Sequence, residues 1–203
     1  MPEKQSIKPN KRAIIAIHGW TGNVNSLKSL SKQWGFAETT WVFIEGPYKA
    51  KSKGFSWFKG NDQDGWEYEE SFDILNHTIE SLIESGYQHK HIYMLGFSQG
   101  ACLTMEFMIR RKFSIGGIIP ISGFIKNKSY FKELKNILSK DTKILLLHGQ
   151  KDNIINAKES RIAFKLFVDL GFKTDIHIFK GGHKIPLKAK KLIQEKIFTN
   201  ICI

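Results

Sequence analysis

The chain has 203 residues, of which 41% are hydrophobic and 25% charged, and its net charge is +12. This length and composition predict one globular domain over residues 1–203 and exclude a disulfide-stapled or disordered chain, since only Cys102 and Cys202 are cysteines. The basic residues are mostly lysines spread along the sequence without a nucleic-acid-binding motif, so we expect no nucleic-acid partner.

The first twelve residues form a polar, lysine-rich segment. They contain no apolar core of roughly 7–15 residues, which a secretory signal would need. The apolar runs further along the chain are of strand length and too short to span a bilayer. We therefore expect a cytoplasmic protein with two reduced thiols and no stable membrane insertion; the oligomeric state is left open.

Short apolar runs predict the strands. They lie at 13–17, 41–44, 92–95, 117–121, 144–147 and 175–179. Because these runs are apolar on both faces, they indicate a mostly parallel sheet of about six strands that is buried between helices.

Runs with helical spacing alternate with these strands. They lie at 27–34, 72–83, 101–109, 131–138, 162–170 and 192–197, and Gly86 and Gly171 mark two of their ends. Alternation of this kind predicts a single-domain α/β fold with helices on both faces of the sheet. The link between Gly123 and Lys143 has room for only one short helix, so no separate cap domain is expected.

The stretch from Glu45 to Trp66 is expected to be a long irregular loop. It combines several glycines with five aromatic residues, which argues against disorder. Its aromatic side chains either anchor the loop on the core or line a substrate pocket. On the second interpretation, Trp57 and Phe58 bind substrate together with Trp20.

The stretch Gly96-Phe97-Ser98-Gln99-Gly100 has the form G-x-S-x-G. It follows a predicted strand and precedes a predicted helix, the setting in which this pattern exposes a serine hydroxyl above a sheet. The pattern favours Ser98 as a nucleophile over a serine that merely occupies a glycine-rich turn.

A serine nucleophile needs a base and an acid that orients the base. On this type of turn the acid and then the base follow the serine in the chain, at the carboxyl ends of strands. Among the later acidic residues, only Asp152 follows a strand closely. Among the histidines, His183 follows the last strand, whereas His148 precedes Asp152 and His177 lies within a strand. Asp152 could also be a turn or helix N-cap, and His183 a surface residue in a glycine turn.

Two backbone N–H groups are needed to bind the oxyanion. We expect them from Gln99, which follows the nucleophile, and from Trp20, in the loop after the first strand. The histidines and acids show no metal-ligand spacing, and this chemistry needs no cofactor.

Three segments resemble the phospholipase/carboxylesterase family of α/β-hydrolases, which includes acyl-protein thioesterases and small bacterial carboxylesterases. They are Gly96–Ala101, His148–Asp152 and Gly181–Pro186. The resemblance implies a triad of Ser98, Asp152 and His183, with Trp20 and Gln99 as oxyanion donors. The chain departs from the family where relatives have His-Gly-Leu-Gly-Asp, because Trp20 and Thr21 follow His18-Gly19 here. The loop at 45–66 is also unlike that of acyl-protein thioesterases.

The sequence thus predicts a carboxylesterase that hydrolyses small acyl esters through an acyl-enzyme. The alternatives are a thioesterase or lysophospholipase-like hydrolase using the same site, or a catalytically silent α/β-hydrolase that acts as a binding module.

Overall fold

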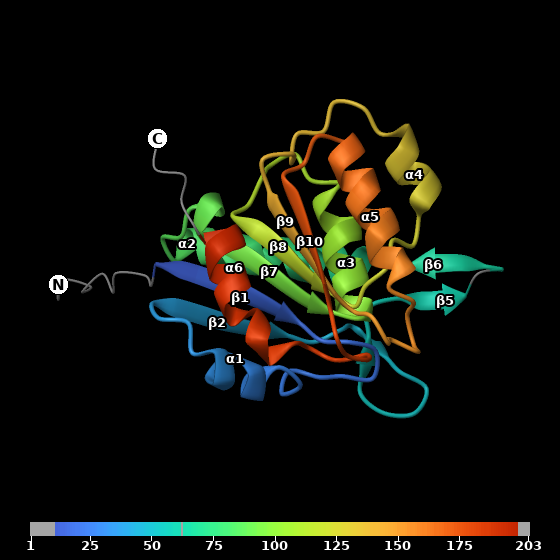
Figure 1. Cartoon of the computed structure of the whole chain (residues 1–203), viewed down its shortest axis with the longest axis horizontal. Coiled ribbons are helices and arrows are strands. Elements are labelled where there is room, and N and C mark those ends of the chain that lie inside the picture. The colour runs from blue at the N-terminus through green and yellow to red at the C-terminus, as the bar shows by residue number, and fades with distance from the viewer. Residues whose placement is uncertain (1–10, 62, 199–203) are drawn as a thin grey trace.

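A sheet of six parallel strands runs through the middle of the computed structural model, which describes residues 11–61 and 63–198 (Figure 1). In pairing order the strands are β10 (Thr174–Phe179), β9 (Lys143–Gly149), β8 (Gly117–Ile121), β7 (Ile92–Phe97), β1 (Arg12–Ile17) and β2 (Thr39–Ile44). Every predicted apolar run is one of these strands, so the predicted α/β fold class is confirmed. Parallel strands bring all their carboxyl ends to one edge of the sheet.

Helices cover both faces of the sheet, as predicted. The side chains of β1 alternate between the two sides: Ala13, Ile15 and Ile17 join one buried cluster, and Ile14 and Ala16 join the other. The first cluster contains side chains of α2 (Glu69–Glu84), α3 (Gln99–Met108), α4 (Lys128–Glu133) and α5 (Lys158–Asp169). The second contains side chains of α1 (Lys28–Trp34), α6 (Lys190–Ile193) and the π-helical turn Gln194–Phe198, and α6 crosses in front of the strands in Figure 1.

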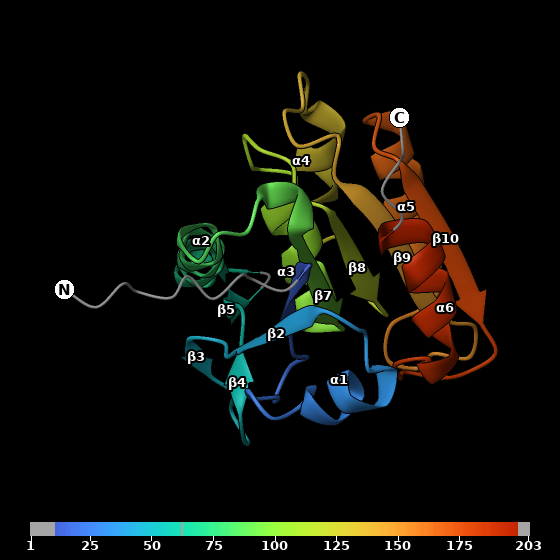
Figure 2. The same ribbon diagram turned by 90° about the vertical axis from the view of Figure 1, so that its left-hand side faces the viewer.

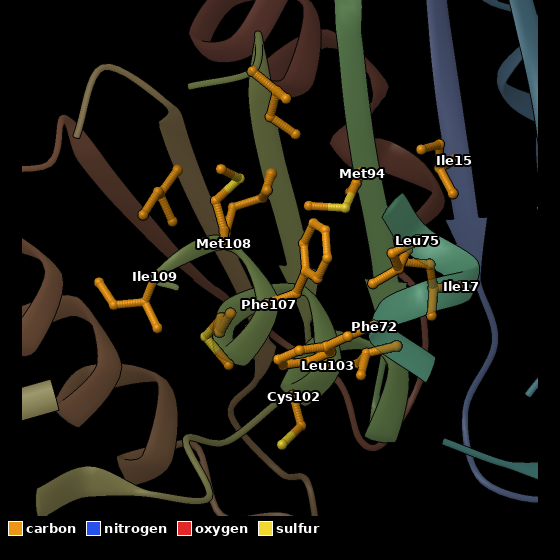
Figure 3. Packing of buried hydrophobic residues seen from close by; sticks show 14 of the residues in the cluster. Ile15, Ile17, Phe72, Leu75, Met94, Cys102, Leu103, Phe107, Met108 and Ile109 are labelled. Carbon is orange, nitrogen blue, oxygen red and sulfur yellow. The ribbon is translucent and has the colours of Figure 1, made fainter. Parts of the chain in front are cut away.

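The helix that follows Ser98 is the most deeply buried of these. Every residue of α3 from Gly100 to Met108 is buried. In Figure 3, Leu103 and Phe107 of this helix lie among side chains of α2 and the sheet. This packing fixes the N-terminal end of α3, and therefore the turn before it, against the centre of the sheet.

The predicted helix at 131–138 is shorter than expected. It is α4 (Lys128–Glu133), which begins after Asn127, whose side chain accepts a hydrogen bond from Tyr130 N–H. The chain turns extended at Leu134, and Asn136 is left-handed with φ 56°. The prediction was wrong for Ile137 and Leu138, because the chain has already left the helical conformation at Leu134 and Asn136; Ile137 still packs partly on the core, whereas Leu138 is 62% exposed.

The stretch from Glu45 to Trp66 is also more regular than predicted. It contains two antiparallel pairs, β3 (Tyr48–Lys49) with β4 (Phe55–Ser56), and β5 (Lys59–Asn61) with β6 (Gly65–Glu67). Glycines with positive φ, such as Gly54 at 64° and Gly65 at 90°, make the tight reversals possible. In Figure 1 the β5–β6 hairpin projects at the end of the molecule toward which the arrowheads of the sheet point.

The link from β8 to β9 contains α4 and no other helix or strand, in agreement with the predicted absence of a cap domain there. Cys102 is a buried free cysteine, and burial raises the pKa of its thiol. Cys202 and residues 1–10 of the polar N-terminal segment lie outside the described residues.

We predict that Phe107→Ala lowers the free energy of unfolding by about 3–5 kcal/mol, because it opens a cavity between α3, α2 and the sheet. Leu138→Ala is the control, since most of the Leu138 side chain is in water, and it should change stability by less than about 0.5 kcal/mol. Urea denaturation monitors both. Equal losses of unfolding free energy in the two variants would contradict the difference in burial between Phe107 and Leu138.

Candidate active site

Ser98 lies on the sharp turn between β7 and α3. Its backbone has φ 54° and ψ −114°, a conformation that residues with a side chain rarely adopt. Two hydrogen bonds hold it there: Ser98 N–H donates to Ile121 O over 2.8 Å, and Cys102 N–H donates to Ser98 O over 3.1 Å. The strain is therefore maintained by the neighbouring strand and by the first turn of α3, and Ser98 remains partly exposed.

The glycines on either side of this turn are required by close backbone contacts. A Cβ atom on Gly96 would lie 2.3 Å from Gly100 O, and one on Gly100 would lie 2.3 Å from Ile17 O. Neither contact can be relieved by moving a flexible side chain, because both partners are backbone atoms. The G-x-S-x-G spacing thus reflects how tightly the turn packs on itself and on β1.

Asp152 follows β9 and is buried. Its Oδ1 accepts hydrogen bonds from the N–H groups of Ile154 and Ile155, both over 2.9 Å, and its Oδ2 lies 2.7 Å from His183 Nδ1. Burial by itself raises the pKa of this carboxyl, but the hydrogen bonds from Ile155, His183 and Ile154 outweigh it and hold the pKa of Asp152 below its ordinary value. The side chain is both the cap of the turn and the partner of a histidine, as the sequence allowed.

His183 reaches Asp152 from the loop after β10. Because an ionised carboxylate can only accept, His183 Nδ1 donates this hydrogen bond, which leaves Nε2 as the acceptor of a neutral ring. The imidazole also lies against the ring of Phe97, with 4.9 Å between ring centroids. Since Phe97 precedes Ser98, the structure brings the His183–Asp152 pair to the same end of the sheet as the serine turn.

The glycine loop before His183 packs on the end of β9. Lys151 N–H donates to Gly181 O over 2.8 Å, and a Cβ atom on Gly149 would lie 2.2 Å from Gly182 O. Gly149 therefore lets the two loops that carry Asp152 and His183 approach each other. This function of Gly149 was not predicted, although its place at the very end of the strand is the available signal.

A second histidine, His148, lies beneath Asp152 and is fully buried. Its Nε2 lies 2.8 Å from Ile155 O and 3.3 Å from Asp152 Oδ2, and its Nδ1 lies 2.6 Å from Ser160 Oγ. A carbonyl oxygen only accepts, so Nε2 carries a hydrogen, and Nδ1 shares a hydrogen bond with the serine hydroxyl. His148 thus braces the Asp152 turn on α5 and has no exposed surface for substrate.

The loop after β1 carries the predicted oxyanion donor Trp20. It is held by the buried ring of His18: Gly46 N–H donates to Nε2 over 3.1 Å, so Nδ1 carries the hydrogen and donates to Gly19 O over 2.7 Å. Burial lowers the pKa of His18 and keeps the ring neutral in this arrangement. Among the described residues, the Trp20 N–H and the Gln99 N–H donate to no protein acceptor.

Trp57 connects this loop to the serine turn. Its indole N–H donates to His18 O over 2.8 Å, and its backbone N–H donates to Gln99 Oε1 over 2.9 Å. The side chain is fully buried, so it has no surface for the substrate contact expected from the sequence. Its neighbour Ser56 donates to Phe58 O over 2.7 Å and accepts from the Gln99 amide over 3.0 Å.

Two surface grooves lie at this end of the sheet, one on each side of the serine turn. The first, of about 580 Å³, is lined by Trp20, Phe97 and His183 among others. The second, of about 650 Å³, is lined by Gln99 and Phe58 among others. Trp20 is 57% exposed, whereas Phe58 is largely buried.

In residues 11–61 and 63–198, no group of three or more His, Cys, Asp or Glu side chains is placed to hold a metal ion. None of the helices described there is long and apolar enough to cross a membrane.

Known proteins are similar to this chain in sequence and in fold. A family model described as Phospholipase/Carboxylesterase matches residues 4–202. A probable inactive carboxylesterase of Oryza sativa subsp. japonica is 25% identical, with 91% of this chain and 83% of the rice protein covered. Acyl-protein thioesterase 1 of Kluyveromyces lactis is 29% identical, with 79% of this chain and 78% of the yeast protein covered. The crystal structure of esterase PE8 is 25% identical and superposes with a TM-score of 0.79, covering 92% of this chain and 93% of that one.

We predict that Ser98→Gly is more stable than Ser98→Ala by about 1 kcal/mol. Glycine relieves a backbone strain of about 1–3 kcal/mol. Its greater conformational freedom in the unfolded chain opposes this gain by about 0.5–1 kcal/mol. Both variants lack the hydroxyl, so the comparison isolates the φ 54° backbone. Chemical denaturation of the pair measures the difference, and an alanine variant of equal or greater stability would exclude strain at this turn.

We also predict that Asp152 contributes stability that acid removes. Because the pKa of the folded-state carboxyl is below its ordinary 3.8, this contribution is complete above pH 3.8 and is lost as the pH falls through the folded-state pKa. The gap in unfolding free energy between the native protein and Asp152→Asn should therefore narrow below that pH. Urea titrations across the acid range measure it, and a constant gap would contradict the prediction.

Proposed function

This chain belongs to the phospholipase/carboxylesterase family of α/β-hydrolases, and we propose that it is a serine hydrolase that cleaves carboxylic esters. The observation that carries the proposal is the 2.7 Å hydrogen bond between His183 Nδ1 and Asp152 Oδ2, at the sheet end where Ser98 is held on its strained turn. Relatives of this chain include proteins named probable carboxylesterases and acyl-protein thioesterases, which agrees with acyl transfer at this end of the sheet.

In the first half of the proposed reaction, His183 Nε2 accepts the Ser98 proton while Oγ attacks the ester carbonyl carbon. The resulting oxyanion is bound by the N–H groups of Trp20 and Gln99, which have no protein acceptor. The C–O bond to the leaving group then breaks, and the departing alcohol takes the proton from His183. The acyl group remains on Ser98 as an ester.

In the second half, water replaces the alcohol. His183 takes a proton from the water as it attacks the acyl-enzyme, and the proton then passes to Ser98 as the carboxylic acid leaves. Asp152 stays ionised throughout and holds the imidazole in the tautomer with the hydrogen on Nδ1. Its lowered pKa agrees with this task, because only the ionised carboxylate stabilises the positive charge that His183 acquires with the Ser98 proton.

We assign the substrate contacts from the residues that line the two grooves. Trp20 stands at the mouth of the first groove and Phe58 lines the second. We assign to these two side chains the acyl and leaving-group contacts, and to the buried Trp57 the task of positioning the loops that carry them. A thioester would react at the same site by the same steps, with a thiol as the leaving group.

A catalytically silent protein is the competing hypothesis, because one relative is named a probable inactive carboxylesterase. A silent protein would not need a serine that reacts as a nucleophile. Labelling by a fluorophosphonate, which forms a bond only with an activated serine oxygen, therefore separates the two hypotheses.

We predict that Ser98→Ala abolishes fluorophosphonate labelling and lowers kcat on a soluble short-chain aryl ester by at least about 10³-fold, with an unchanged circular dichroism spectrum. Ser122→Ala is the matched control. Ser122 directly follows the neighbouring strand β8, also with a positive φ, but its side chain is fully buried, and its variant should label as the native protein does. A folded Ser98→Ala variant that keeps its activity, or a native protein that does not label, overturns the proposal.

A further inference from the structure

Large apolar side chains are exposed around the candidate active site. Of the five that the described residues expose, three lie at the carboxyl end of the sheet: Trp20 at 57%, Leu187 at 53% and Ile154 at 69%. Trp20 and Leu187 line the same groove as His183. Ile154 follows Asp152 closely and lines the groove on the other side. The apolar side chains therefore flank both sides of the site.

Exposed lysines surround these apolar residues. They come from the β3–β4 turn, from the turn after β9 and from the loop after β10: Lys49, Lys51, Lys53, Lys151, Lys180, Lys184 and Lys188. Within the described part of the chain, none of them forms an ion pair. Lys53 and Lys184 line the groove that contains Trp20 and Leu187, so the positive charges and the apolar side chains share one surface.

The elements that carry this surface lie at one end of the molecule. In Figure 2 the arrowheads of β8 and β10 point toward the lower part of the view, where the β3–β4 hairpin also lies, whereas α4 lies at the upper edge. The charges thus extend across the end of the sheet where Ser98 is placed.

We propose that this end of the protein, defined by Trp20, Ile154, Leu187 and the seven lysines, docks reversibly on the surface of an anionic lipid bilayer. Tryptophan and aliphatic side chains favour the boundary between headgroups and acyl chains. Lysines keep their charge among the headgroups while their stems cover apolar surface, and each gains about 1 kcal/mol near an anionic leaflet. An acidic macromolecule would match the lysines but gives no reason for apolar side chains on both sides of the site. This inference goes beyond ester hydrolysis, because docking requires no chemistry at Ser98.

The test measures sedimentation with phosphatidylcholine vesicles that contain or lack phosphatidylserine, using the Ser98→Ala variant so that no lipid is hydrolysed. Binding should require phosphatidylserine and weaken with added salt. The triple variant Lys51→Gln, Lys180→Gln, Lys188→Gln should bind about a hundredfold more weakly, at about fivefold for each lysine. These three lysines line neither groove at the site, so hydrolysis of a soluble ester should be unchanged when Ser98 is present.

A control triple variant separates a docking surface from overall charge. Lys135, Lys140 and Lys173 are exposed, form no ion pair within the described residues and precede β9 or β10, at the opposite end of the sheet. Their replacement by glutamine removes the same net charge and should change vesicle binding by no more than about twofold, since charges beyond a Debye length of about 8 Å act weakly.

A second pair of variants tests the apolar contact. Leu187→Asp should weaken vesicle binding by at least about tenfold, because it removes one aliphatic side chain that docking would bury in the bilayer. Leu138→Asp, which alters an equally exposed leucine at the other end of the molecule, should leave binding unchanged.

Three results overturn the proposal: equal binding to vesicles without phosphatidylserine, equal losses in the two triple variants, or binding to polyglutamate with no binding to vesicles. The last would assign the surface to an acidic macromolecule. Failure of docking is distinct from failure of the proposed function, because hydrolysis of a soluble ester tests the latter without any vesicle.

Discussion

The backbone of Ser98 is the constraint on which the rest of the site depends. Its φ of 54° costs free energy that the turn does not recover locally. Gly96 and Gly100 permit the turn only because they have no side chain, and the contact of Gly100 with Ile17 O joins it to β1. Burial of α3 along its whole length offsets the cost, since one strained residue is set against a helix that packs on all sides. The core therefore stabilises a turn that would not form by itself.

The order of the strands determines which side chains can reach this turn. Since β7, β8, β9 and β10 are consecutive neighbours in a parallel sheet, the loops after them lie at one edge. Asp152 and His183 follow the last two strands, and the contact between Gly149 and the Gly181-Gly182 loop brings them to 2.7 Å. His148 and His18 are buried, and each holds a loop in place by hydrogen bonds. Of these four groups near one edge, His148 and His18 hold loops, Asp152 orients His183 from a buried position, and His183 lines the groove.

The strands and the candidate triad could be predicted because each leaves a local pattern. Apolar runs and the G-x-S-x-G turn are short-range features, and the position of Asp152 and His183 after strands needs only the chain order. The length of α4 could not be predicted, because Leu134 and Ile137 reach the core from an extended and turning chain, and their apolar spacing is the same as that of a helix. Nor could the burial of Trp57, since it depends on hydrogen bonds to His18 and Gln99, which are 39 and 42 residues away. The aromatic residues indicated that the loop is important, but they did not distinguish a side chain that anchors the loop on the core from one that contacts substrate.

Charges act differently in the interior of the site and at its rim, by which we mean the seven exposed lysines that surround it. Inside, one ionised carboxyl, Asp152, is enclosed by hydrogen-bond donors, and the two N–H groups of Trp20 and Gln99, which have no protein acceptor, act over a few ångströms. At the rim, the lysines are exposed and water screens them beyond a Debye length of about 8 Å. They are therefore too screened to stabilise the oxyanion of the proposed reaction, but seven of them acting together can attract an extended anionic surface. On this proposal the backbone N–H groups serve the chemistry, and the lysines of the rim serve the approach to a membrane.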